Sequence, residues 1–554
     1  MPPDGLPDFQ NAGFELLQER RPEGLVGRAL VTTRHMLGLL FGGAFAYVRQ
    51  QKAHGQAGTF ELVLLRIGLV FVWPFMDKTL IRQPFPVQFR RRLELLGPTY
   101  IKLGQILSLR EELLPKPLTD ELKNLLDRLP AVPYERFKEL IELDLKRSAD
   151  SVFPWIEPVP LGSASLAQSH RAILTTYEIV VLKVLKPGVR VTVERDLRLL
   201  RFTGRVLQLF LARYQPARLI NEFSSYTLKE VDLRFEAENA ETFAVNFKDE
   251  PDVCFPKIYR EFSNRDVLCM EYFEGDKPSP SAVAKLTTSQ KNKVINLGVG
   301  AIIRMIFRDG FFHADLHPAN LIIFDDARVG FIDLGMVGRF DSDMQKRLLY
   351  YSYSLVVGDA ANAARYITSI AFASKDSDTD GFRRAAEDLY RRWLRSPNFH
   401  DFSMAQVILE SVILAGRYRI QYPGEFILMT KALLTLEGVG NMIEPGIDLT
   451  TAARSHVQKI VLQQYNPASF IRDSLLLFPE LVDLLNRSPL VLSEGLRVIE
   501  KSLKQPQSRS LAEIRGPLLA GFCLVSAAIL VAFGGPWPLW VSLFVIAFVL
   551  AVKS

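Results

Sequence analysis

Two short segments near the middle of the chain carry polar side chains on either side of one apolar run. The first segment, FFHADLHPAN, contains Asp315 and, five residues later, Asn320. The second segment, GFIDLG, contains Asp333, which lies eighteen residues after Asp315. The apolar run LIIF and the Asp-Asp turn that follows it predict a short hairpin between the two segments. Because a hairpin brings its two ends together, we expect the fold to hold these three polar side chains close to one another.

These side chains suit chemistry on a nucleoside triphosphate. Mg²⁺ prefers hard oxygen ligands, which Asn320 and Asp333 supply, and Asp315 can orient an attacking hydroxyl or water or accept its proton. The spacing resembles the catalytic and metal-binding loops of kinases. Two alternatives are a metal site made by His313, Asp315 and His317, and a buried turn with satisfied polar groups. Neither alternative explains the later Asp-Leu-Gly sequence.

A kinase-like site also needs a lysine on a strand and an acid on a helix to hold it. Lys183 lies in EIVVLKV, a strand-like stretch that ends at a Lys-Pro-Gly turn, although such a lysine can also be an edge or surface residue. Glu230 and Glu236 are the candidate acids, with a solvated helix face as the alternative. Six residues separate them, so on one ideal helix they point about 120° apart. One should therefore pair with Lys183, and the other should face elsewhere.

Further motifs occur in the order found in the UbiB family of atypical kinase-like proteins, the aarF-domain kinases, which this chain resembles. The sequence YIKLGQ at residues 100–105 matches the KxGQ motif of the family, and EVD at 230–232 matches its ExD motif. The sequence LGSASLAQ at 161–168 looks like its alanine-rich nucleotide loop. EGVG at 437–440 lies in a stretch similar to that of bacterial members. The resemblance covers roughly residues 85 to 470.

The resemblance implies ATP and Mg²⁺ as cofactors and assigns roles to individual residues. Asp315, Lys183 and Glu236 would be catalytic, and Asn320 and Asp333 would hold the metal. In the family the KxGQ lysine pairs with the ExD acid above the substrate cleft, which leaves Glu236 for Lys183. The expected regulatory residues are Lys102, Gln105 and Glu230. The expected nucleotide contacts are Gly162, Ser163, Ala164, Ser165 and Lys183, with Met270, Glu271 and Phe273 from the strand-like stretch 266–273.

The sequence departs from the family and from ordinary protein kinases at several positions. Gly162 stands where the family loop commonly has alanine, which adds backbone freedom and affects nucleotide preference. Ala314 replaces the usual arginine of the catalytic loop, and no Ala-Pro-Glu motif follows Gly335. These departures argue against a peptide substrate. We expect an ATPase or a kinase for a small or lipid-like acceptor that supports isoprenoid-quinone biosynthesis, with a nucleotide-gated pseudokinase scaffold as the alternative.

The C-terminal sequence predicts a membrane anchor. Residues 517–533 and 539–552 are apolar runs separated by GGPWP, which together indicate a transmembrane hairpin over 516–553 with both ends in the cytoplasm. A buried helical pair or a re-entrant hairpin is the alternative. Two further apolar stretches, 29–48 and 60–76, contain basic residues, so core or interfacial helices are expected there rather than spanning ones.

Few strands followed by many helices predict an α+β, two-lobed protein-kinase-like fold. The expected parts are an N-terminal helical, possibly membrane-proximal region at 1–84, a KxGQ extension at 85–150, an N-lobe at 151–273, a C-lobe at 274–500, and the hairpin. In the extension, TDELKNLLDRL predicts a helix with Thr119 as its N-cap.

The cysteine count, the N-terminal sequence and the net charge narrow the expected compartment and partners of the protein. Three cysteines at no metal-like spacing indicate a reducing compartment, and the N-terminus lacks a signal-peptide pattern. With the predicted hairpin, the resemblance to bacterial members implies the bacterial inner membrane, with the kinase-like part in the cytoplasm. The net charge of +6 argues against a nucleic-acid partner. The expected partners are a membrane lipid or quinone precursor, quinone-biosynthesis proteins, and a second copy in a homodimer.

Overall fold

The structure of the protein is a computed structural model, and its described residues all lie in the compact unit Met1–Gln464. They are residues 24–53, 78–81, 83–108, 114–125, 131–210, 215–373, 377–395, 404–446, 453 and 455–460. The predicted transmembrane hairpin, 516–553, and the apolar stretch 60–76 lie outside the described residues.

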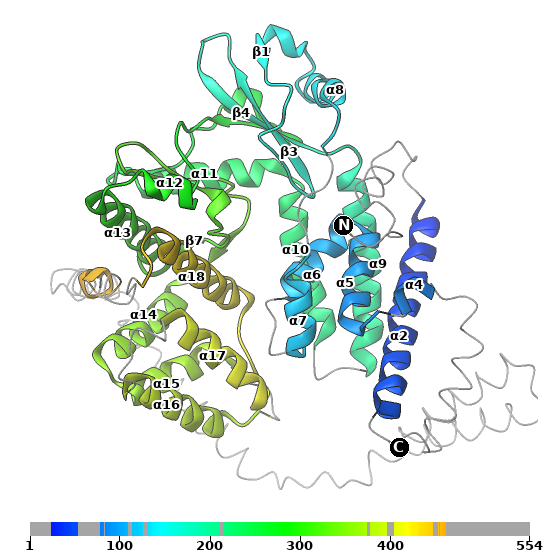
Figure 1. The fold of residues 1–554 in the computed structure, drawn as a ribbon, viewed down its shortest axis with the longest axis vertical. Coiled ribbons are helices and arrows are strands. Elements are labelled where there is room, and N and C mark those ends of the chain that lie inside the picture. The colour runs from blue at the N-terminus through cyan, green and yellow to red at the C-terminus, as the bar shows by residue number, and fades with distance from the viewer. Residues whose placement is uncertain are drawn as a thin grey trace, which may run out of the picture. The chain divides into compact units, whose positions relative to one another are not determined.

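A group of helices precedes the sheet in the chain and packs against two long helices that follow its central strands (Figure 1). The short sequence Gly97-Pro98 separates α5 from α6, because Gly97 adopts φ +93° and the proline can only begin a helix. Arg28 on α2 forms an ion pair with buried Asp196 on α9, with Nε and Oδ1 2.6 Å apart. The helices of this group are α2 (Leu25–Ala53), α4 (Lys78–Ile81), α5 (Phe85–Leu96), α6 (Pro98–Leu107) and α7 (Lys116–Leu122), and the two long helices are α9 (Val189–Phe210) and α10 (Pro216–Glu230).

The prediction for the start of α7 was wrong. The helix begins at Lys116, and Thr119 lies within it, where its hydroxyl donates to the Lys116 carbonyl. The reason is Pro117, which occupies the first turn of the helix, where proline needs no hydrogen-bond partner.

The N-lobe contains a five-stranded antiparallel sheet with the order β1-β3-β4-β6 and with β2 paired to β3. Side chains alternate across β4: Val180 and Leu182 face the helix α8, whereas Val181 and Leu185 join the core shared with α6 and α9. Lys183 therefore lies on the face of the sheet that is directed at α6 and α9. The elements of the N-lobe are α8 (Tyr134–Leu145), β1 (Trp155–Ile156), β2 (Gly162–Ser163), β3 (Ala167–Ile173), β4 (Ile179–Leu185), α11 (Leu233–Asn246) and β6 (Val267–Glu271).

The C-lobe is mainly helical and contains three small sheets in its described residues, β10-β7, β5-β9-β8 and β11-β12. One large apolar core joins its helices and strands. The elements are β5 (Val253–Cys254), α12 (Pro280–Ala284), α13 (Thr288–Arg304), a π-helical turn (Met305–Asp309), β7 (Phe311–His313), β8 (Leu321–Ile323), β9 (Val329–Phe331), β10 (Val337–Arg339), α14 (Ser342–Val357), α15 (Ala360–Ile370), β11 (Phe372–Ala373), α16 (Thr379–Arg395), α17 (Met404–Arg417), β12 (Ile420–Gln421) and α18 (Gly424–Ile443). The mixed, two-lobed kinase-like architecture expected from the sequence is present.

Within the described part of the chain, α18 alone is long and apolar enough to cross a membrane. Half of its most apolar window is buried inside the protein, and Phe426, Met429 and Ala432 belong to the C-lobe core. We therefore describe α18 as a core helix of the C-lobe.

Candidate nucleotide and metal site

The predicted hairpin brings the catalytic-loop and metal-loop residues together. Strand β8 pairs with β9, and the backbone N–H of Ile332 donates to the carbonyl of Asn320 at 2.9 Å. The side-chain amide of Asn320 donates to the carbonyl of Asp315 at 3.0 Å and to its Oδ2 at 3.2 Å. Because the amide nitrogen faces Asp315, the amide oxygen is the part of Asn320 that suits a metal ion.

The two histidines of this loop serve its geometry. His313 is fully buried, its Nδ1 lies 3.1 Å from the backbone N of Asp315, and its Nε2 lies 3.2 Å from the carbonyl of Ile332. Burial lowers the pKa of His313, so the neutral ring is favoured. His317 accepts the backbone N–H of Ala319. Among the described residues no group of three or more His, Cys, Asp or Glu side chains is placed to hold a metal, so the alternative histidine site is not supported.

Lys183 lies between two carboxylates. Its Nζ is 2.8 Å from Glu236 Oε1 and 2.7 Å from Asp333 Oδ1. The Glu236 side chain is only 6% exposed, whereas that of Asp333 is 51% exposed and open to a ligand. The positive charge of Lys183 lowers the pKa of Asp333, whereas burial raises the pKa of Glu236. Asp333 is therefore the ionised, accessible carboxylate, with oxygens that fit Mg²⁺.

Lys102 and Glu230 form a second ion pair beside this cluster. Lys102 Nζ lies 2.8 Å from Glu230 Oε1, which joins α6 to the last residue of α10. Lys183 lowers the pKa of Asp333 most, and the charge of Lys102 adds to that effect. Gln105 lies one turn after Lys102 on α6 and is partly buried.

Glu230 and Glu236 do pair with different lysines, as expected, but the assumption that they lie on one helix was wrong. The two acids do not share one helix, because α10 ends at Glu230 and α11 begins at Leu233. Asp232 caps α11 by accepting the backbone N–H of Arg234 at 3.2 Å. The chain thus changes direction between the two glutamates.

The predicted nucleotide loop is a tight turn between β2 and β3. Gly162 and Ser163 pair with Ser169 and Gln168, and the Ala164 N–H donates to the Ala167 carbonyl at 2.9 Å. Gly162 and Ala164 are exposed, and Ser165 is buried. Contact of these four residues with a nucleotide stays a prediction.

Met270 and Glu271 end β6, and Phe273 follows them. Glu271 accepts the backbone N–H of Lys257 at 3.1 Å, and Phe273 packs edge-on against Phe324. Glu271 and Phe273 line a cavity of about 300 Å³ whose wall also includes Cys254. None of the catalytic-loop side chains lines that cavity. A nucleotide bound at the catalytic loop would therefore have to contact Met270, Glu271 or Phe273 outside this cavity.

The sequence analysis missed Lys431. This residue comes from α18, and its Nζ lies 2.8 Å from Asp315 Oδ1. Burial alone would raise the pKa of Asp315, but the charge and the hydrogen bond of Lys431, with smaller contributions from His313 and Lys102, together lower it. A signal existed: Lys431 is the only charged residue between Glu425 and Glu437 in an otherwise apolar stretch, where a lysine needs a partner.

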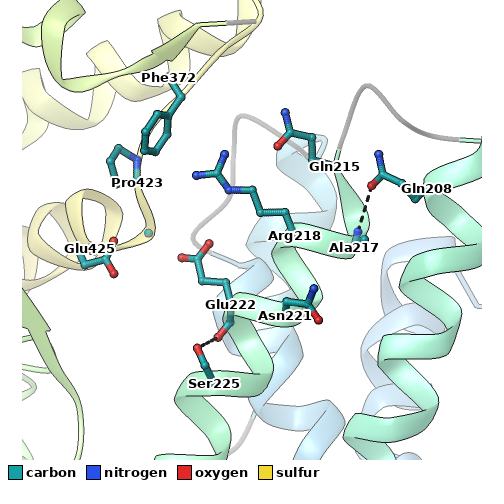
Figure 2. Close-up of a pocket in the computed structure, with 11 residues that line it drawn as sticks. Gln208, Gln215, Ala217, Arg218, Asn221, Glu222, Ser225, Phe372, Pro423 and Glu425 are labelled. Carbon is teal, nitrogen blue, oxygen red and sulfur yellow. Dashed lines mark hydrogen bonds between the residues drawn. The ribbon is translucent and has the colours of Figure 1, made fainter.

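An open cavity of about 850 Å³ lies away from these groups, between α10 and the start of α18 (Figure 2). Arg218 and Glu222 line one wall, and Phe372 and Glu425 line the other. The Arg218 guanidinium lies over the Phe372 ring, 4.6 Å from its centre. No residue of the kinase-like site lines this cavity.

Comparison with known proteins identifies the family to which this fold is similar. The model of the ABC1 atypical kinase-like domain matches residues 124–367, and that of the UbiB helical domain matches 387–448. The probable protein kinase UbiB of Shewanella woodyi is 30% identical over 451 residues, which cover 79% of this chain and 82% of that protein. The protein of the same name from Azotobacter vinelandii is 29% identical over 489 residues, covering 87% and 91%.

The fold and the site define an atypical kinase-like protein. With these relatives, the chain belongs to the ABC1/UbiB family. A solved complex of Rv3197 with erythromycin from Mycobacterium tuberculosis has 21% sequence identity and a TM-score of 0.40, covering 63% of this chain and 93% of that one. That similarity is too low to support an argument.

Proposed function

We propose that the protein binds Mg·ATP beside Lys183 and Asp333 and either hydrolyses it or phosphorylates a lipid-like acceptor, in support of isoprenoid-quinone biosynthesis. The observation that carries the proposal is the convergence of five side chains: Lys183 is held by Glu236 and reaches Asp333, while Asn320 holds Asp315. The name of the relatives supports the kinase class.

Each residue has a definite task in this proposal. Asn320 and Asp333 would hold Mg²⁺, which when bound neutralises phosphate charge. Lys183, kept in place by Glu236, binds phosphate oxygens. Asp315 orients the hydroxyl of the acceptor, or a water molecule, and accepts its proton. The absence of the usual catalytic-loop arginine, replaced by Ala314, is consistent with an acceptor that is not a peptide.

The test is phosphate release by the purified protein in liposomes, with and without a polyprenyl-phenol-like compound. We expect release to depend on Mg²⁺ and to rise with the compound. Asp315→Asn is the matched control, because it changes one atom of the site and excludes a contaminating ATPase. Release that persists in this variant would contradict the proposal.

A second candidate function is a nucleotide-gated scaffold for biosynthetic partners. The observation that favours it is that Lys183 and Lys431 each occupy a carboxylate of the site, Asp333 and Asp315 respectively. Nucleotide binding without turnover in the same liposome experiment would support the scaffold over the enzyme.

We further propose that residues 516–553 anchor the protein in the bacterial cytoplasmic membrane, with the kinase-like part in the cytoplasm and a membrane lipid or quinone precursor as its partner. The apolar runs of the sequence support this proposal. Deletion of the residues after Arg515 should move much of the protein to the soluble fraction. If the truncated protein still resists carbonate extraction, the anchor lies elsewhere, and the N-terminal apolar stretches become the candidates.

A further inference from the structure

Both oxygens of the catalytic aspartate have a partner in the protein. Lys431 Nζ lies 2.8 Å from Asp315 Oδ1, and the Asn320 side-chain amide donates to Oδ2 at 3.2 Å. A carboxylate paired in this way is a poor proton acceptor, because both oxygens already accept from cationic or polar donors. For Asp315 to act as a base, one of these two partners must move away from its carboxylate.

Lys431 is the partner that can move. Its side chain is 29% exposed and is unbranched, so its charge can be redirected by rotation of its stem. Asn320 is buried and tied through its backbone to Ile332, which fixes it in the loop.

The helix that carries Lys431 is packed into the C-lobe core. The flanking residues Thr430 and Ala432 are buried, and Thr430 bonds to the preceding turn of α18. At the start of the same helix, Glu425 accepts the Tyr226 hydroxyl of α10 at 3.0 Å. The lysine is therefore presented to the site from a fixed position.

The three lysines around the site differ in what holds them. Lys183 pairs with Glu236, and Lys102 pairs with Glu230, so each has a glutamate partner. The ion-pair partner of Lys431 is Asp315 itself. Lys431 is thus the cation whose charge becomes available when an anionic phosphate approaches Asp315.

We propose that Lys431 is a phosphate-binding residue that holds Asp315 in the resting protein and transfers to the terminal phosphate of ATP when Mg·ATP binds. The transfer frees Asp315 to accept the proton of the acceptor, so that binding of the triphosphate and release of the base are coupled. This inference rests on the proposed function, because it assigns a residue to the same site.

The test compares the affinities of Mg·ATP and Mg·ADP for Lys431→Met and for the wild-type full-length protein in detergent. A contact to the terminal phosphate predicts about a tenfold loss of Mg·ATP affinity with Mg·ADP affinity little changed. The matched control is Lys285→Met, which removes an exposed C-lobe lysine paired with Asp276 and should change neither affinity. Equal loss for both nucleotides, or loss for neither, would overturn the proposal.

A second variant approaches the same ion pair from its other side. Asp315→Asn releases Lys431, so Mg·ATP affinity should rise about threefold, and more than Mg·ADP affinity. In the double variant with Lys431→Met this gain should disappear. A gain that persists in the double variant would show that it comes from lost repulsion alone and would overturn the proposal. If Lys431→Met does not fold, an equal gain for both nucleotides in Asp315→Asn would overturn it.

Failure of the proposed function has a separate signature. If the wild-type protein binds neither nucleotide, the proposed function is wrong, and the role of Lys431 is overturned with it. If the wild-type protein binds both nucleotides and Lys431→Met binds them equally well, only the role of Lys431 is wrong.

Discussion

Two lysine–glutamate pairs of equal length do different work in this protein. Lys183–Glu236 and Lys102–Glu230 both have N–O distances of 2.8 Å. The first pair is buried against the sheet and extends to Asp333, whereas the second joins the helices α6 and α10. The two glutamates are six residues apart in sequence, but the capped break at Asp232 separates them into two helices.

The comparison shows that the role of each lysine–glutamate pair depends on what else the pair contacts. The Lys183 pair includes a half-exposed carboxylate that can receive a metal ion, so changes there should affect nucleotide binding directly. The Lys102 pair holds a helix over the site, so changes there should act through the position of that helix.

The largest effect is expected at Asp333, the accessible carboxylate of the first cluster. Asp333→Asn should weaken Mg·ATP binding by about a hundredfold, because a hard anionic oxygen is lost and the metal loses a ligand. A thermal-shift titration with Mg·ATP measures this loss. Asp326→Asn, at an exposed aspartate of the same hairpin, is the control and should bind normally. An unchanged shift in Asp333→Asn would remove Asp333 from the metal site.

An intermediate effect is expected when each glutamate is neutralised in turn. Glu236→Gln should lower Mg·ATP affinity by about tenfold, because Lys183 loses the charge that positions it for phosphate. Glu230→Gln should lower Mg·ATP affinity by less than about threefold, since its partner Lys102 holds the helix α6 over the site. Isothermal titration of both variants makes the comparison. Equal losses would show that the two pairs do the same work, and the distinction drawn here would fail.

The smallest effect is expected in the coupling between Lys102 and Glu230. In a double-mutant cycle on nucleotide affinity, Lys102→Ala and Glu230→Ala should be non-additive by about 0.5–1 kcal/mol, because either change alone breaks the same ion pair. Strictly additive effects would argue that the pair carries no energy relevant to binding. Complete loss of binding in Lys102→Ala would instead indicate direct contact between Lys102 and the phosphates.

The local parts of the site follow from residues that are neighbours along the chain. The spacing of Asp315, Asn320 and Asp333 around one apolar strand was sufficient to predict the hairpin that joins them, because a hairpin depends on neighbouring residues. Alternation along the strand that carries Lys183 likewise depends on local geometry.

The contacts that distant segments make with these parts depend on tertiary packing. The helix break between Glu230 and Glu236 depends on the N-cap at Asp232 and on a hydrogen bond from the Leu233 N–H to the Arg265 carbonyl. Sequence spacing reveals neither contact. Lys431 reaches Asp315 across 116 residues of sequence, and its partner was set by the packing of α18 in the C-lobe core. Spacing predicts contacts within one element, but contacts between elements follow from how their apolar faces pack.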